Sequence, residues 1–303
     1  MAQDTYALIR IALLLAGLGI ASAMDIKSRT VSDRVWIALG AAGIPLLSWE
    51  AYHLSGGASL LLLLPILVAY LDPYWDRPPL YDRQEGIYLP ALALCVLCAL
   101  VTAVAALRAL DAAAILLFPV LTLLALFHLL FHAGVLYGGA DAKAMMAVAL
   151  LVPRYPAIEA IPLIQPAPVL AQALNIAFPF ALLVLMNAAL VASLFPICNL
   201  VRNALRGDTA FPEALLGYRM RVDDAGKRFV WPMERLEDGE RVLVLFPSRK
   251  RDYTEVLRRL KDAGIEEIWV TPKQPFIVAI SAGFILSLLI GNPVLGVLRL
   301  LGL

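Results

Sequence analysis

The sequence predicts an all-α polytopic membrane protein with one small α/β domain inserted before its last helix. Apolar residues make up 61% of the 303 residues, and the mean hydropathy is +0.80. Charged residues make up only 16%, against about 25% in soluble domains. They also cluster, since residues 202–273 hold 15 of the 25 Lys and Arg and 13 of the 24 Asp and Glu. This composition excludes a disordered chain, most soluble enzymes and a nucleic-acid-binding protein built on basic patches.

Eight hydrophobic segments follow one another along the chain, and a membrane-spanning helix needs ~20 apolar residues. The third and sixth segments are short, and Pro179 and Pro196 predict bends in the seventh. We expect eight spans, or six if the third and fourth segments do not cross. The segments are Tyr6–Met24, Arg34–His53, Ser59–Leu71, Ile87–Leu107, Asp111–Leu136, Ala142–Val152, Val169–Leu200 and Pro275–Ile290, followed by a Leu-rich tail from Val294 to Leu303.

Basic residues set the expected orientation in the membrane. Lys27, Arg29 and Arg34 follow the first apolar segment, so the positive-inside rule places this loop in the cytoplasm. The same rule places the basic stretch 202–273 there. An even number of spans then separates the two, and Asp141 falls on the cytoplasmic side when the third and fourth segments both cross.

The charged stretch also predicts the domain boundaries: a membrane domain over 1–201, a soluble cytoplasmic α/β insert over 202–273, and a last transmembrane helix with its tail over 274–303. Within the insert, Arg219–Val222 and Arg228–Trp231 flank Asp223–Lys227, a pattern typical of a β-hairpin with glycine in its turn. Further elements are expected as strands over Arg241–Phe246 and Glu266–Thr271 and a helix over Asp252–Ala263. The acidic residues Glu234, Glu237, Asp238 and Glu240 are expected on a solvated face.

Asp25 and Asp141 lie where ionisable groups are costly, at the boundaries of apolar segments. Two carboxylates that share a half-buried site also share a proton, and such a pair can supply one base and one acid. The structural alternative is that each Asp caps a helix or pairs with a nearby Lys27 or Arg29. The adjacent Gly138 and Gly139 favour the functional interpretation, because they allow a sharp turn and a close approach of the backbone.

Two motifs carry a resemblance to a known family. The stretch from Asp25 to Trp36, DIKSRTVSDRVW, resembles the first catalytic motif of archaeal preflagellin and type IV prepilin peptidases. The stretch Gly138–Lys143, GGADAK, resembles their second motif, G-x-G-D, with Ala140 in place of a glycine. Thr271–Phe276, and Pro179–Phe180 with Asn187, also resemble the archaeal members. The two Asp are 116 residues apart, so the region around 57–107 exceeds what a minimal member requires.

The resemblance implies a membrane aspartic endopeptidase that removes the short leader from archaellin or type IV pilin precursors at the cytoplasmic face. Asp25 and Asp141 are its implied catalytic pair, and which of them acts as the acid stays open. The implied partners are these membrane-anchored precursors and the lipid bilayer of the cell membrane. No metal or organic cofactor is implied, and no nucleic acid. The residues that support the motifs are Gly138, Gly139, Ala140, Lys143, Lys27 and Arg29.

Other residues allow other interpretations. His128 and His132 are spaced i, i+4, which can bind a metal, although hydrogen bonding between helices is the favoured role. Cys95 and Cys98 lie in an apolar run and are interpreted as small apolar residues of one helix. For the whole chain, a transporter or channel that uses carboxylates at the membrane boundary is the main alternative. A non-catalytic scaffold is the third possible function.

Overall fold

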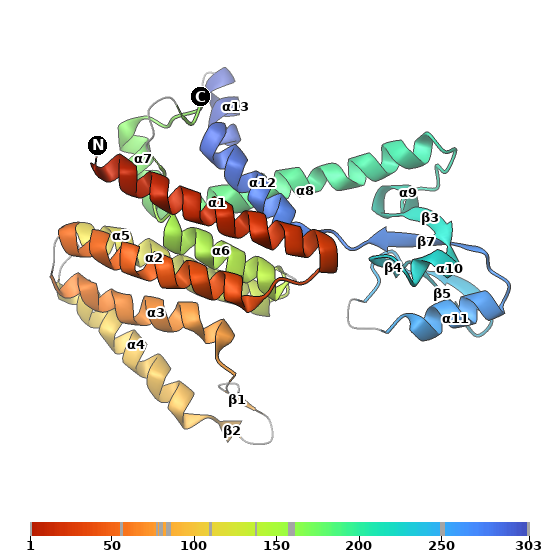
Figure 1. Cartoon of the computed structure of the whole chain (residues 1–303), viewed down its shortest axis with the longest axis horizontal. Coiled ribbons are helices and arrows are strands. Elements are labelled where there is room, and N and C mark those ends of the chain that lie inside the picture. The colour runs from red at the N-terminus through yellow and green to blue at the C-terminus, as the bar shows by residue number, and fades with distance from the viewer. Residues whose placement is uncertain are drawn as a thin grey trace. The chain divides into compact units, whose positions relative to one another are not determined.

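The computed structural model describes residues 2–54, 57–76, 78, 81–82, 86–108, 111–136, 138–156, 161–248 and 252–301. Its contacts divide the chain into two compact units. The first unit combines Met1–Ala189 with Ile277–Leu303 and consists mainly of helices (Figure 1). The second unit, Leu190–Phe276, contains three short helices and most of the strands.

The elements of the first unit follow the predicted segments closely. They are α1 (Ala2–Ser28), α2 (Asp33–Leu54), the 3-10 helix η1 (Ala58–Leu62), α3 (Leu63–Leu71), η2 (Asp72–Tyr74), β1 (Tyr81–Asp82), β2 (Gly86–Ile87), α4 (Leu89–Arg108), α5 (Ala112–His132), α6 (Gly139–Leu151), α7 (Pro168–Ala177), α12 (Phe276–Leu289) and α13 (Pro293–Leu300). The long helix α8 (Phe180–Ala204) begins in this unit.

Among the described residues, five helices are long and apolar enough to cross a membrane, namely α1 from Tyr6 onward, α2, α4, α5 and α8. Ala58–Tyr74 and Phe276–Leu289 are apolar but shorter. The mainly helical fold with several helices able to span a membrane is therefore confirmed, while length and composition support five spans where the sequence predicts eight. The predicted segment Val169–Leu200 is two helices, α7 and α8, because Pro179 at the junction lacks a backbone N–H donor.

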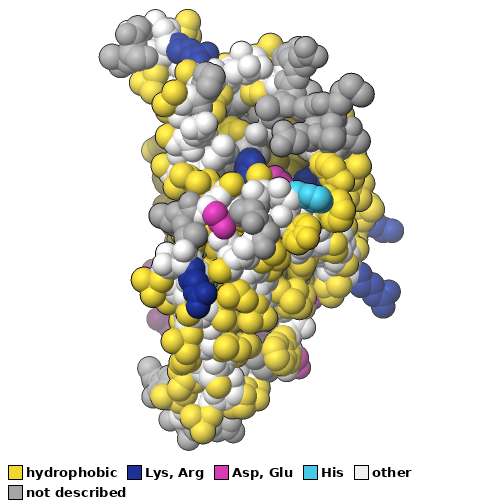
Figure 2. Space-filling model, turned by 90° about the vertical axis from the view of Figure 1, so that its left-hand side faces the viewer, with side chains coloured by type: hydrophobic (Ala, Val, Ile, Leu, Met, Phe, Trp, Pro, Cys, Tyr) yellow, Lys and Arg dark blue, Asp and Glu magenta, His cyan; other side chains and the backbone are white. Residues whose placement is uncertain are grey.

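Helix α6 forms the core of the first unit. Ala142 and every residue from Ala144 to Leu151 are buried, and the helix packs against α1, α2 and α5. A helix that is apolar all round has to be enclosed by others. Its 13 residues extend about 20 Å, less than the ~30 Å hydrocarbon core of a bilayer. Large apolar side chains remain exposed on the surrounding helices, and yellow atoms dominate the face in Figure 2.

The second unit is built on a three-stranded antiparallel sheet of order β3-β7-β4, with β3 at Tyr218–Arg221, β7 at Glu267–Pro272 and β4 at Val230–Pro232. The predicted hairpin around Asp223–Lys227 is wrong. Residues Val222–Ala225 form the short helix α10, and β3 and β4 both pair with β7 and not with each other. The reason is burial, because Val222 and Ala225 pack in a core with Leu260, Ile268 and Val270.

A hairpin that the sequence analysis missed lies nearby, between β5 (Glu234–Glu237) and β6 (Glu240–Leu243). Its two turn residues, Asp238 and Gly239, have φ of 51° and 86°, the positive values that a type I′ turn requires. Glu234 does not lie on a solvated face as expected. It is 4% exposed, accepts the Trp269 N–H at 2.9 Å and forms an ion pair with Arg241.

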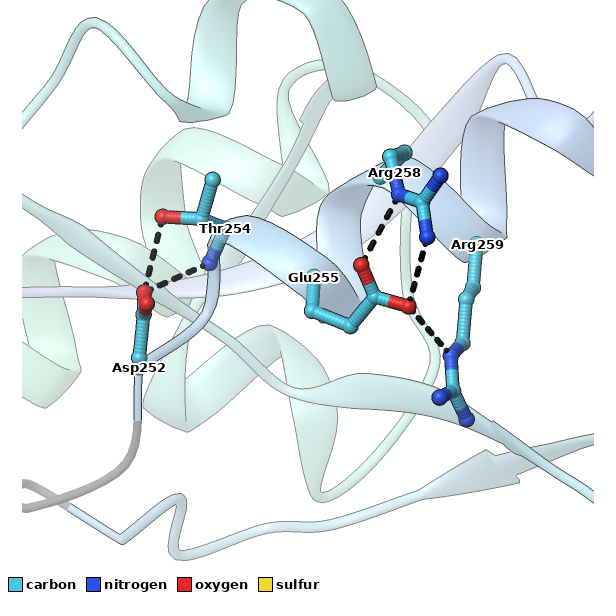
Figure 3. Close-up of polar contacts among 5 residues, drawn as sticks. All are labelled: Asp252, Thr254, Glu255, Arg258 and Arg259. Atoms are coloured by element: carbon cyan, nitrogen blue, oxygen red, sulfur yellow. Dashed lines mark hydrogen bonds and ion pairs between the residues drawn. The ribbon is translucent and has the colours of Figure 1, made fainter.

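The second unit also contains the short helix α9 (Glu213–Leu216) and helix α11 (Thr254–Asp262). Helix α11 begins with a local network of polar contacts, drawn in Figure 3. The Asp252 carboxylate accepts the Thr254 N–H at 2.9 Å and the Thr254 hydroxyl at 2.7 Å. Hydrogen bonds from Arg258 and then Arg259 lower the pKa of Glu255 to about 2. Negative charge in the first turn and positive charge in the last turn complement the helix dipole.

Candidate active site at one end of the helix bundle

Asp25 lies in the last turn of α1 and is only 8% exposed. Its Oδ2 accepts the backbone N–H of Ile277 at 3.2 Å. Ile277 is in the first turn of α12, where N–H groups have no partner inside the helix and the helix dipole favours an anion. The bond therefore fixes the Asp25 carboxyl group between two helices that are 252 positions apart in the sequence.

Arg29 ends the helix that carries Asp25. Its φ of 56° is the left-handed conformation that often follows the last residue of a helix. Its backbone N–H and its Nη1 donate to the backbone carbonyl oxygen of Asp25 at 2.9 and 3.0 Å. Arg29 thus holds the main chain at Asp25, whereas Lys27 is exposed on the same turn.

Asp141 lies in the first turn of α6, and its carboxylate lies against Gly138. A Cβ added at Gly138 would be 2.4 Å from Asp141 Oδ2, far inside van der Waals contact. The predicted reason for the glycine pair is therefore corrected, since Gly138 has an ordinary extended backbone (φ −97°) and provides space for the carboxylate. Gly139 is less constrained, as its Cβ would be 3.7 Å from Phe131. Ala140 lies inside α6, where alanine is favourable, so this departure from the family motif costs no backbone strain.

Lys143 connects the start of α6 to the segment that follows Asp25. Its Nζ is 2.5 Å from Asp33 Oδ1, at the first residue of α2, and 4.7 Å from the centre of the Tyr74 ring. The Lys143 side chain is only 15% exposed, so its role is this contact. Figure 1 agrees with the link, because α6 begins at the end of the bundle where α1 ends. The two Asp motifs are thus brought to one end of the first unit.

The other candidate residues have structural contacts. His128 Nε2 donates to the Ala69 carbonyl oxygen at 2.8 Å, a bond between α5 and α3 that matches the favoured expectation. Asn187 donates to Ser287 Oγ at 2.8 Å near the far end of α12. Within the part of the chain that the structure describes, no three His, Cys, Asp or Glu side chains gather as a metal site.

Two contacts of this site were missed by the sequence analysis. Asp33 lies inside the first motif, and its partner role depends on Lys143, 110 residues later in the chain. The contact of Tyr74 was not predicted from the sequence, and its ring lies against the Lys143 ammonium group. In the sequence, the Asp33–Lys143 contact is indicated by an acidic residue at the start of α2 and a lysine near the start of α6.

Comparison with known proteins finds similarity to one family of peptidases. Residues 210–292 match the family described as Archaeal Peptidase A24 C-terminus Type II. The preflagellin peptidase of Methanocaldococcus jannaschii is 33% identical over 168 residues, which cover 53% of this chain and 65% of that protein. This chain is similar to preflagellin peptidases. The preflagellin peptidase of Methanococcus voltae is 23% identical over 297 residues, covering 96% of this chain and 99% of the relative. That of Methanococcus maripaludis is 27% identical over 175 residues, covering 55% and 68%.

The match to the Methanocaldococcus jannaschii preflagellin peptidase spans slightly less than two thirds of that protein's length. The match to the Methanococcus voltae preflagellin peptidase is nearly end to end, so it includes both Asp motifs and the second unit. The predicted resemblance is confirmed. These relatives do not favour the transporter or channel alternative, since all three carry the name of a peptidase.

Proposed function

We propose that this protein is a membrane aspartic endopeptidase that removes the leader from archaellin or type IV pilin precursors. The observation that carries the proposal is the arrangement of Asp25 and Asp141 at one end of the bundle. Asp25 is nearly buried and bound to the start of α12. Asp141 is half-buried in the first turn of α6, and α6 is tied by Lys143 to the segment after Asp25. The peptidase names of the three relatives support the same activity.

The chemistry follows from one proton shared by two carboxyl groups. The ionised carboxylate removes a proton from water while the water oxygen attacks the scissile carbonyl carbon. The protonated carboxyl group gives its proton to the carbonyl oxygen. The tetrahedral intermediate then loses the amine, which takes a proton from the first carboxyl group, while one hydroxyl of the intermediate returns its proton to the second carboxylate. The peptide bond has been exchanged for a carboxylic acid and an amine, and the pair again holds one shared proton.

The contacts of Asp25 suit one member of a proton-sharing pair. The α12 N–H stabilises an ionised Asp25, and burial in an apolar bundle opposes ionisation. Binding of an extended leader next to the start of α12 would replace the Ile277 contact and free the Asp25 carboxyl group for catalysis.

The proposal includes the side of the membrane on which the site lies and the arrangement of the domains along the chain. By the positive-inside rule, Lys27, Arg29 and Arg34 support a cytoplasmic position for the Asp end of the bundle. The charged residues 202–273 form a cytoplasmic insert between the membrane domain over 1–201 and the last helix and tail over 274–303, in a chain that crosses the membrane eight times. The archaellin or pilin precursor then approaches from the cytoplasm with its basic leader, and its own hydrophobic helix lies in the bilayer.

The test is cleavage by the full chain, purified and reconstituted into lipid vesicles. The substrates are an archaellin precursor and a type IV pilin precursor, each retaining its transmembrane helix, and mass spectrometry locates the cut. We expect a single cleavage between the leader and the hydrophobic helix of at least one precursor. Intact precursors after prolonged incubation with excess protein would contradict the proposed function.

A further inference from the structure

A cavity of about 530 Å³ opens at the end of the bundle opposite the Asp motifs. Residues of α1, the last turn of α2, and the segment that follows α6 line it, and all of them belong to the first unit. Arg10 in its wall precedes Asp25 by fifteen residues of one helix, which corresponds to about 22 Å. The cavity is thus separate from the candidate active site.

Among the described residues that line this cavity, the guanidinium groups of Arg10 and Arg154 outnumber the carboxylate of Glu50. Arg10 is 6% exposed, lies 2.9 Å from Glu50 and donates to the Leu46 carbonyl oxygen at 2.7 Å. Arg154 lies 3.7 Å from the other oxygen of Glu50, and its side chain is 38% exposed. Two guanidinium groups therefore share one carboxylate. Arg10 is held by these two contacts, whereas the Arg154 side chain lies in the cavity wall and stays partly exposed.

Apolar and aromatic side chains form the remaining wall. Tyr6, Ile11, Trp49, Leu151 and Tyr155 line the cavity beside the charged groups. Figure 2 shows this face of the molecule, with basic, acidic and histidine side chains gathered at its middle and yellow apolar atoms around them. A site with a cationic centre and apolar borders at the end of membrane helices matches an amphiphile with an anionic head.

We propose that this cavity binds a phosphate-bearing lipid, with the phosphate on Arg154 and the hydrocarbon chain along the apolar wall. Arginine is suited to phosphate because its planar fork donates two parallel hydrogen bonds. Glu50 holds Arg10 and leaves the net positive charge of the three groups at Arg154. Inorganic phosphate offers the same charge without the chain, so the apolar wall favours the lipid.

The experiment measures lipid binding by native mass spectrometry of the full purified chain in detergent. The probes are phosphatidylglycerol, which is anionic, phosphatidylcholine, which is zwitterionic, and inorganic phosphate. We expect preferential retention of phosphatidylglycerol, weakened about fivefold by Arg154→Gln, since one Arg near a lipid phosphate is worth about that factor. Arg154→Lys keeps the charge, so its affinity for phosphatidylglycerol should lie between those of the wild type and Arg154→Gln. Glu50→Gln should tighten binding, because it removes the opposing charge.

Arg108→Gln is the matched control, because Arg108 is an exposed arginine at the end of α4 that does not line the cavity. It should leave phosphatidylglycerol binding unchanged. Equal losses with Arg108→Gln and Arg154→Gln would overturn the proposal in favour of general surface attraction. Full displacement of phosphatidylglycerol by millimolar inorganic phosphate would overturn the lipid assignment. Because proteolysis is not measured, these outcomes are independent of the proposed peptidase activity.

Discussion

The carboxylate of Asp25 and the backbone N–H of Ile277 form a 3.2 Å hydrogen bond that joins α1 to α12. One side chain therefore serves two purposes, as a proposed catalytic group and as the cap of a helix start. The helix it caps follows β7 after only three residues, Lys273–Pro275, so this bond lies close in the chain to the second unit. Substitutions at Asp25 have to separate the two roles.

Replacement of Asp25 by Asn and by Ala should separate them. Asn keeps an oxygen that can accept the Ile277 N–H, so Asp25→Asn should unfold at close to the wild-type temperature. Asp25→Ala leaves the N–H of a buried helix start without an acceptor and should lower stability by about 1 kcal/mol. Thermal unfolding in detergent measures both variants. Equal stability of the two would mean that the hydrogen bond contributes nothing to the fold.

The two glycines before Asp141 should differ in their tolerance of a methyl group. Gly138→Ala places a Cβ 2.4 Å from Asp141 Oδ2 and forces the carboxylate to move, so we expect a loss of at least about tenfold in kcat. Gly139→Ala meets Phe131 only at 3.7 Å and should retain activity and gain a few tenths of a kcal/mol in helix stability. Steady-state kinetics with one precursor measures kcat for both variants. Similar activity of both variants would remove the proposed reason for Gly138.

The Lys143–Asp33 pair should couple the two motifs. Because the Asp33 side chain is 52% exposed, we expect a coupling free energy of only about 0.5–1 kcal/mol in a double-mutant cycle of unfolding. The effect on kcat should be larger, about tenfold for Lys143→Gln, since small displacements of a catalytic group are costly. Asp33→Asn should lower kcat to the same extent, and the double variant should lose no more activity than either single variant. Additive losses would show that the two residues act independently.

Sidedness can be tested with single cysteines in a chain whose three free cysteines, Cys95, Cys98 and Cys198, are replaced by Ser. Cysteines at the exposed positions Ser32 and Ser248 should react with an impermeant maleimide only from the cytoplasmic side. A cysteine at Tyr52 should react only from the other side, because the 22 residues of α2 extend about 33 Å. Labelling of Ser32 and Tyr52 from one side would exclude α2 as a span.

Much of the site was predictable because its determinants are local in the sequence. The Asp25 motif, the Gly138–Asp141 motif and the charge boundary near residue 202 each lie within a short stretch. The contacts that hold the site are not local, since Asp25–Ile277 and Asp33–Lys143 span 252 and 110 positions. The residue pattern of one helix does not specify which distant N–H group or carboxylate its side chains will contact.

The errors in the second unit have a different cause. The pattern Asp223–Lys227 has turn residues in the right order, but burial of Val222 and Ala225 selects a helical turn and sends both flanking strands to β7. The true hairpin at Asp238–Gly239 was visible as an Asp-Gly pair, the most favourable sequence for its turn. Glu234 was indistinguishable from its exposed neighbours, because its partners Trp269 and Arg241 come from other strands.

The central claim is that Asp25 and Asp141 act as one proton-sharing pair, and the most direct measurement is the cleavage rate of variants lacking each ionisable group. Asp25→Asn and Asp141→Asn are assayed on a precursor that retains its transmembrane helix, at equal amounts of folded protein. Asp76→Asn is the matched control, since Asp76 is an exposed aspartate that follows α3. We predict that each of the first two variants loses cleavage by at least about a thousandfold, as expected when half of a catalytic unit is removed, while the control keeps the wild-type rate. Retention of cleavage within about tenfold of wild type by either Asp25→Asn or Asp141→Asn would contradict the account.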